Sequence, residues 1–185
     1  MDLRTFRNDD FDRGASRAKE LLWLIAGELL VAGPIPGSQW RVALLRAFGA
    51  KIEGGAVIKP RVRIKFPWRL EVGADSWIGE SVWIDNLATV RIGHDVCISQ
   101  DAYLCTGNHD WSKGSFDLVT APITIEDHCW VGARATLAPG THMQAGAILG
   151  LAALGQGVVQ GWTIHATAKA SVVRARPPQQ TSEGP

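Results

Sequence analysis

Aliphatic residues recur every six positions through most of this chain, and that period constrains the fold more than any other feature. The hexads Val72-Gly-Ala-Asp-Ser-Trp, Ile78-Gly-Glu-Ser-Val-Trp and Ile84-Asp-Asn-Leu-Ala-Thr follow one another directly. A period of six fits neither an amphipathic helix nor an alternating strand. It is typical of a parallel β-helix, whose short strands stack around one continuous core. The same repeat position is occupied elsewhere by Ile52, Ile58, Ile64, Ile92, Ile98, Leu104, Ile125, Val131, Leu137, Met143 and Leu149.

Three hexads make one coil of such a solenoid, so coils should begin about eighteen residues apart. The sequence indicates coil starts at residues 52, 72, 92, 125 and 143. Two coils therefore carry extra residues, near Leu70-Glu71 and Val90-Arg91, and a third carries a long insertion after Leu104. We expect a β-helix domain over residues 51–165, with the insertion forming a loop at 107–122. Insertions of this kind lie on one side of a solenoid and are often functional.

Residues 1–50 are expected to form a helical segment, with helices over 16–30 and 40–48 that end at Gly33-Pro34 and Gly49. Trp23, Leu24 and the leucines around them are predicted to pack on the β-helix, and the alternative is peripheral contact with a membrane. The apolar run 21–33 is shorter than the roughly 20 residues that span a bilayer. Residues 166–185 are expected to be a C-terminal extension with a disordered tail.

The net charge of +1 gives no strong field that would attract nucleic acid or anionic lipid, so no nucleic-acid partner is expected. Cys97, Cys105 and Cys129 have neither paired nor metal-ligand spacing. Reduced cysteines and a polar N-terminus without a secretory signal favour a cytoplasmic protein, and a position at the inner face of the membrane is the alternative.

One column of outward-facing positions is apolar, which predicts a ladder of exposed side chains on one face of the solenoid. Adjacent rungs lie about 4.8 Å apart, so these side chains would form one continuous patch. Such a patch favours self-association, and the alternative is that the N-terminal helices cover it. The column consists of Val57, Trp77, Cys97, Trp130 and Ile148.

The insertion contains one histidine, His109, which is flanked by Asn108, Asp110 and Trp111. A neutral imidazole can accept a proton from a hydroxyl near neutral pH, so His109 is the candidate general base, and the alternative is a structural role in the loop. His94 and His128 fall near the same corner of neighbouring coils, but no third ligand falls in register with them, and no metal site is expected.

Several runs resemble the colanic-acid-biosynthesis acetyltransferases, a family of hexapeptide-repeat acyltransferases. The resemblance is carried by Ile98-Ser-Gln-Asp-Ala-Tyr-Leu-Cys-Thr-Gly-Asn-His-Asp-Trp and by Leu118-Val-Thr-Ala-Pro-Ile-Thr-Ile-Glu-Asp-His-Cys-Trp-Val-Gly-Ala. It implies a left-handed β-helix and a homotrimer with active sites between subunits. It also implies O-acetyl transfer from acetyl-CoA to a sugar hydroxyl, such as that of an exopolysaccharide precursor. His109 aligns with the family's catalytic base, which lets the hydroxyl attack the thioester directly.

The same resemblance assigns the remaining site residues. Either Asp85 or Asn86 contacts the acceptor, and the alternative for each is hydrogen bonding within a corner of the solenoid. Asp110 and Trp111, beside His109, are expected to contact the acceptor as well. Trp130, Gly132 and Ala133, with Gly150 and Leu151 in the next coil, match stretches that border the pantetheine arm of the cofactor.

The C-terminal end departs from the family pattern, because the prolines and the Gly-Asn-Pro sequence of the relatives are absent. Lys169 and Arg174 are the remaining candidates for contacts with the CoA phosphates. This departure keeps a second class open, a non-catalytic β-helix scaffold that has lost its donor site. An alternative closer to sugar O-acetylation is an acetyltransferase whose acceptor is a small alcohol that is not a saccharide. A third class, a zinc hydratase of the carbonic-anhydrase type, requires three histidines that converge between subunits.

Overall fold

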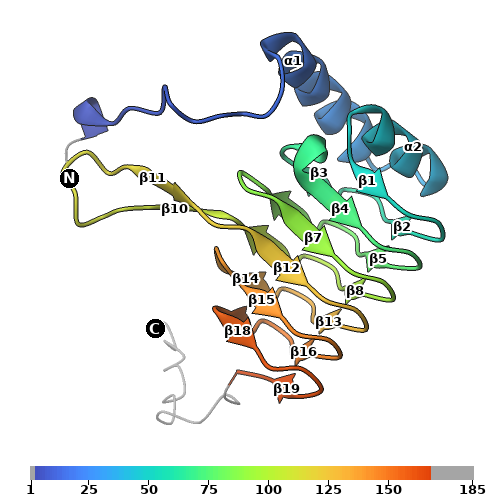
Figure 1. Ribbon diagram of the computed structural model, residues 1–185. Coiled ribbons are helices and arrows are strands. Elements are labelled where there is room, and N and C mark those ends of the chain that lie inside the picture. The colour runs from blue at the N-terminus through green and yellow to red at the C-terminus, as the bar shows by residue number, and fades with distance from the viewer. Residues whose placement is uncertain (1–2, 168–185) are drawn as a thin grey trace, which may run out of the picture.

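The computed structural model describes residues 3–167, and the chain forms a parallel β-helix with two helices at one end (Figure 1). Three sheets run along the solenoid. Sheet 1 contains β1 (Lys51–Ile52), β4 (Leu70–Val72), β7 (Val90–Ile92), β12 (Ile123–Ile125), β15 (His142–Met143) and β18 (Val158–Val159). Sheet 2 contains β2 (Val57–Ile58), β5 (Trp77–Ile78), β8 (Cys97–Ile98), β13 (Trp130–Val131), β16 (Ile148–Leu149) and β19 (Ile164–His165). Sheet 3 contains β3 (Arg63–Ile64), β6 (Trp83–Asp85), β9 (Tyr103–Cys105), β14 (Thr136–Leu137) and β17 (Leu154–Gly155).

The strand register confirms the coils that the repeat predicts. Ile52 pairs with Val72, Val72 with Ile92, and Ile125 lies between Ile92 and Met143. Every repeat position is buried, so the hexad aliphatics form the core. The residues four positions after each aliphatic are mostly small and are also buried. The exceptions are Trp68 and Ala88, which are half-buried. Both exceptions lie just before the three-residue strands β4 and β7, where the coils take up their extra residues.

The insertion is a β-hairpin that projects from the side of the solenoid. Strand β10 (Gly107–His109) pairs antiparallel with β11 (Leu118–Thr120), and His109 lies opposite Leu118. The chain before α1, which includes a 3₁₀ turn at Leu3–Thr5, runs alongside this hairpin (Figure 1). A second 3₁₀ turn, Pro67–Arg69, fills the corner before β4.

Helix α1 (Arg17–Ala26) begins at Ser16, whose side chain accepts a hydrogen bond from the Lys19 backbone N–H, and it continues as a π-helical turn through Gly27–Val31. Helix α2 (Gln39–Ala47) follows, so both predicted helices are confirmed to within a few residues. The predicted packing of Leu24 and its neighbours is wrong: only Trp23 of α1 is buried, and its indole N–H donates to the Ile64 carbonyl. Apolar periodicity locates an apolar face but does not say whether that face meets the core. None of the helices within residues 3–167 is both long and apolar enough to cross a bilayer.

A buried arginine fixes the linker between the two helices. The Arg41 guanidinium is fully buried and donates to the carbonyls of Val31, Gly33, Ile35 and Gly37. Because one guanidinium donates to all four carbonyls, Arg41 holds the linker between α1 and α2 in a defined arrangement at the end of the solenoid.

The predicted apolar ladder is present on sheet 2. Its members pair in register from Val57 to Ile148, and Trp77 and Trp130 are about half exposed, at 53% and 49%. Helix α2 packs on β1 and β2 and covers only the first rung. The alternative that the helices cover the whole ladder is therefore wrong, and the other rungs face outward.

Candidate active site

The imidazole of His109 is held by the hairpin itself. Its Nδ1 lies 2.8 Å from the carbonyl oxygen of Phe116, which can only accept a hydrogen bond, so Nδ1 carries the proton. The ring stacks on the Phe116 ring at 4.3 Å between centroids and contacts the edge of Phe6 at 5.6 Å. In the neutral ring the lone pair therefore lies on Nε2, and no hydrogen-bond partner for Nε2 is found within residues 3–167. This is the tautomer that a general base requires.

The two residues after His109 belong to the tip of the hairpin. Asp110 accepts hydrogen bonds from the backbone N–H and the hydroxyl of Ser112, at 3.1 and 2.5 Å. The Ser112 hydroxyl, with the nearby Lys113 ammonium, lowers the pKa of the Asp110 carboxyl. Asp110 thus stabilises the turn and does not orient the imidazole. Trp111 is 82% exposed and contributes its indole to the surface of the tip.

Asp85 is the last residue of strand β6 and Asn86 follows it, and their side chains face opposite sides of the solenoid wall. Asn86 is fully buried: its amide oxygen accepts from the Phe66 N–H at 2.9 Å, and its amide nitrogen donates to the Phe66 carbonyl at 2.7 Å. These bonds assign Asn86 to the corner between sheets 3 and 1. Asp85 faces outward, where it forms an ion pair with Lys65 at 3.3 Å and receives a long hydrogen bond from the Tyr103 hydroxyl at 3.4 Å. Its buried Oδ1 accepts no hydrogen bond from the described residues.

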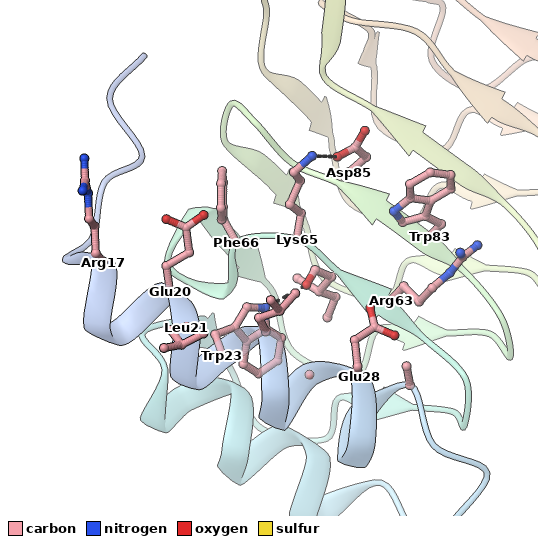
Figure 2. A pocket seen from close by; sticks show the side chains of 14 residues that line it. Arg17, Glu20, Leu21, Trp23, Glu28, Arg63, Lys65, Phe66, Trp83 and Asp85 are labelled. Carbon is pink, nitrogen blue, oxygen red and sulfur yellow. Dashed lines mark hydrogen bonds and ion pairs between the residues drawn. The ribbon is translucent and has the colours of Figure 1, made fainter. Parts of the chain in front are cut away.

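A cavity of about 450 Å³ opens between α1 and the outer surface of sheet 3 (Figure 2). Asp85 and Lys65 lie at one end, and the side chains of Trp23, Phe66 and Trp83 provide apolar walls. Trp83 is stacked between the Arg63 guanidinium at 4.5 Å and the Tyr103 ring at 4.7 Å. Burial, helped by Cys105 and Asp85, raises the pKa of the Tyr103 hydroxyl, which stays protonated and can donate.

His109 and this cavity share one corner of the solenoid. The hairpin leaves sheet 3 directly after β9, and the Thr106 hydroxyl at its base donates to the Asp85 carbonyl at 2.9 Å. His109 does not itself line the cavity. The aromatic stack on Trp83 and the carbonyl of Phe116 were not predicted from the sequence. The register of β3, β6 and β9 could have revealed the stack, because Arg63, Trp83 and Tyr103 occupy one outward column.

The five described residues predicted to bind the donor line a second groove of about 320 Å³. Trp130, Gly132 and Ala133 come from one coil, and Gly150 and Leu151 come from the next. The Trp130 indole N–H donates to the Ser99 hydroxyl at 2.8 Å, which fixes the ring along the groove. Ser99 and Gln100 of the preceding coil complete the lining and were not predicted. Lys169 and Arg174 lie outside the described residues.

Gly132 is required by the solenoid itself. A Cβ at this position would come within 2.7 Å of the Gly150 carbonyl carbon and 2.8 Å of the Leu149 oxygen. Neighbouring coils therefore approach so closely here that no side chain fits.

The groove and His109 lie at different corners of one chain. The groove follows β13, where the chain passes from sheet 2 to sheet 3, whereas the hairpin lies between β9 and β12, where it passes from sheet 3 to sheet 1. One chain therefore does not bring the predicted donor and base residues together.

The other histidines have structural partners. His94 lies 3.1 Å from Glu53 and 3.4 Å from Asp127, and Glu53, followed by Asp127, raises the pKa of its imidazole. His128 occupies a corner position with φ of 61°, as Asp95 does in the preceding coil. Across residues 3–167, no group of three or more His, Cys, Asp or Glu side chains is arranged to hold a metal ion.

Comparison with known proteins agrees with this architecture. The chain is 37% identical over 151 residues to an Escherichia coli K12 protein named "Putative colanic acid biosynthesis acetyltransferase WcaF", covering 81% of this chain and 83% of the relative. A hexapeptide-repeat acetyltransferase from Vibrio cholerae, solved with acetyl-CoA, superposes with a TM-score of 0.73 at 22% identity, over 93% of this chain and 96% of that chain. A galactoside acetyltransferase in complex with coenzyme A superposes with a TM-score of 0.72 at 17% identity, over 93% of this chain and 88% of that chain.

No protein-family model matches the sequence. The identity with the E. coli protein nevertheless extends over more than four-fifths of both chains, and the solved structures share the same fold. The chain therefore belongs to the colanic-acid-biosynthesis acetyltransferase family.

Proposed function

We propose that this protein transfers the acetyl group of acetyl-CoA to a hydroxyl of a saccharide, such as an exopolysaccharide precursor. The observation that carries the proposal is the His109 imidazole, which in its neutral form has its lone pair on Nε2 because Nδ1 donates to the Phe116 carbonyl. Family membership supports acetyl-CoA as the donor. The enzyme would act in the cytoplasm, where acetyl-CoA is available.

The reaction follows from this tautomer. Nε2 of His109 removes the proton from the acceptor hydroxyl while the oxygen attacks the thioester carbonyl. The new C–O bond forms, the C–S bond breaks, and the CoA sulfur takes the proton back from the imidazolium. The Phe116 carbonyl stabilises the imidazolium because it accepts the hydrogen bond from Nδ1–H throughout the reaction. No covalent acetyl-enzyme is formed.

We assign the pantetheine arm of the donor to the groove along Trp130, Ala133 and Gly150. Ala133→Leu should raise the Kd for acetyl-CoA by at least about tenfold, because its larger side chain fills part of the groove. Calorimetric titration of the full-length protein measures this directly. Ala74→Leu, the same change at a half-buried corner position outside the groove, is the matched control and should leave the Kd unchanged. Equal affinity in both variants would place the donor elsewhere.

We assign the acceptor to the cavity on sheet 3, with Asp85 as its polar contact. The Asp85 carboxylate, which is 15% exposed and lies beside the Lys65 ammonium, can accept a hydrogen bond from a sugar hydroxyl, and the exposed part of Trp83 offers an aromatic surface to a sugar ring. Asp85 and His109 share a corner, which would bring a bound hydroxyl toward the base.

Substitutions at the two neighbouring positions should separate binding from folding. Asp85→Asn should raise the acceptor KM by about tenfold and leave thermal stability nearly unchanged. Asn86→Ala should lower the free energy of unfolding by about 1–3 kcal/mol, because it leaves the Phe66 N–H and carbonyl unpaired. The two variants are compared by acceptor titration and by urea unfolding. A selective rise in KM for Asn86→Ala, with normal stability, would reverse the assignment.

We propose that the active site is completed by a second subunit, most simply in a homotrimer. The support is the position of the donor groove, which lies at a different corner from His109. The uncovered ladder on sheet 2, which includes Trp77 and Trp130, offers an apolar surface that association can bury.

Release of free thiol from acetyl-CoA tests the proposed function. The purified protein is incubated with acetyl-CoA and a panel of mono- and oligosaccharides, with small non-saccharide alcohols as a second panel. Saccharide-dependent thiol release is expected. Turnover with alcohols alone would show that the acceptor is a small alcohol and not a saccharide. Failure to bind acetyl-CoA would favour a scaffold without catalysis.

A further inference from the structure

Helix α1 presents apolar side chains to solvent. Five aliphatic residues of α1 and its π-helical extension are between 53% and 68% exposed: Leu21, Leu22, Leu24, Ile25 and Leu29. We call these five residues the leucine face. A surface helix normally turns its apolar stripe toward the core, and a contiguous exposed apolar patch marks an interaction surface. Because α1 lies at one end of the solenoid, this face is open to a large partner (Figure 1).

The charge of the chain is divided between the two ends of the solenoid. Residues 11–70 carry eleven Lys and Arg against four Asp and Glu, a net charge of +7. Residues 71–167 carry three Lys and Arg against ten Asp and Glu, a net charge of −7. The net charge of +1 for the whole chain conceals this division. Arg41 is buried, three other cations pair with Glu71, Glu80 and Asp85 across this division, and Glu28 is exposed beside the leucine face. The end that carries the leucine face therefore keeps a smaller excess of positive charge at its surface.

Basic side chains flank the leucine face at both ends. Arg17 is exposed on the first turn of α1, one helical turn from Leu21. Lys59 is exposed in the corner where the Arg61 backbone N–H donates to the Gly33 carbonyl, next to the end of the π-helical turn. Within residues 3–167, neither Arg17 nor Lys59 forms an ion pair with a carboxylate.

We propose that the leucine face docks on an anionic membrane surface, with its aliphatic side chains in the interface and Arg17 and Lys59 near the lipid headgroups. An apolar helix face bordered by basic residues is the arrangement that binds such surfaces. Contact between two leucine faces around a twofold axis would instead bring two ends with an excess of positive charge together, which charge repulsion opposes.

Docking would place the acceptor cavity close to the membrane. Leu21 and Leu24 of the leucine face also line that cavity (Figure 2), so an acceptor held at the membrane would reach it directly. The docking itself does not depend on the proposed acetyl transfer, and it is measured without turnover.

Vesicle co-sedimentation of the full-length protein tests the proposal. Vesicles of phosphatidylcholine alone are compared with vesicles that also contain phosphatidylglycerol, at low and high salt. We expect binding to the anionic vesicles that is at least about tenfold tighter than to the neutral ones and weaker at high salt. The triple variant Leu22→Ser, Ile25→Ser, Leu29→Ser avoids the cavity and should lose at least about tenfold in vesicle affinity. Arg17→Glu with Lys59→Glu should abolish the preference for anionic vesicles.

The control variant Leu154→Ser with Val158→Ser removes equally exposed aliphatic residues from the acidic end of the solenoid, and it should bind vesicles like the parent protein. Melting curves and light-scattering masses are recorded for all variants. Equal binding of the parent to neutral and anionic vesicles would overturn the proposal. So would an unchanged affinity of the triple variant. If the parent does not bind vesicles and the triple variant has an altered oligomeric mass, the leucine face would instead be a subunit interface.

Discussion

Replacing His109 with alanine should lower kcat for acetyl transfer by about 10²–10⁴, the range that a positioned general base contributes. The alanine variant retains the donor groove and the cavity on sheet 3, neither of which contains His109. Its Kd for acetyl-CoA should therefore equal that of the parent protein. Thiol release under saturating donor and acceptor, together with calorimetry, separates the two quantities.

His142→Ala is the matched control for this substitution. His142 is also half-buried, but it faces outward on sheet 1 and is bonded to Glu126 at 2.6 Å. Its removal should leave kcat unchanged. Full activity of the His109→Ala variant would show that another group accepts the proton, and the proposed mechanism would be wrong.

Mixing two impaired variants should restore activity at limiting acetyl-CoA if each site is built from two subunits. One variant carries His109→Ala with an intact groove, and the other carries Ala133→Leu with an intact His109. Every trimer that contains both variants has one interface that joins an intact groove to an intact His109, so about one site in three should be functional. Thiol release at limiting acetyl-CoA would then rise several-fold above the mean of the two separate variants.

The experiment uses co-expressed chains with two different affinity tags, so that only mixed oligomers are assayed. Separately purified variants that are combined without exchange provide the control and should stay impaired. Absence of recovery in verified mixed oligomers would indicate that the donor groove and His109 serve the same chain, and the two-subunit site would be excluded.

The solenoid was predictable because its period sets which side chains enter the core. Shifting the chain by one residue would move Ile78, Ile84 and Ile98 from the core to the surface, so the sequence specifies one register. The packing of α1 was not predictable, because apolar residues lie on more than one side of the helix. Trp23 faces the solenoid and bonds to the Ile64 carbonyl, whereas the adjacent Leu24 is exposed, and the sequence does not distinguish these two orientations.

The site was predictable in part. Strand alternation from the buried Ile84 would have placed Asp85 outward and Asn86 inward, a signal that the sequence contains. The hydrogen bond between His109 and the Phe116 carbonyl depends on the hairpin register over a connection of eight residues, 110–117, and no sequence pattern specifies that register. The cavity depends on how α1 crosses sheet 3, which only the three-dimensional arrangement reveals.

The fate of an isotope-labelled acetyl group tests the central claim most directly. Acetyl-CoA labelled in its acetyl carbons is incubated with the full-length protein and a saccharide that supports thiol release, and label is followed by mass spectrometry in both saccharide and intact protein. The label should appear as an ester on a saccharide oxygen, with none on the protein at any time before or during turnover. Label that accumulates on the protein, or that never leaves acetyl-CoA, would contradict direct transfer from the donor to the acceptor.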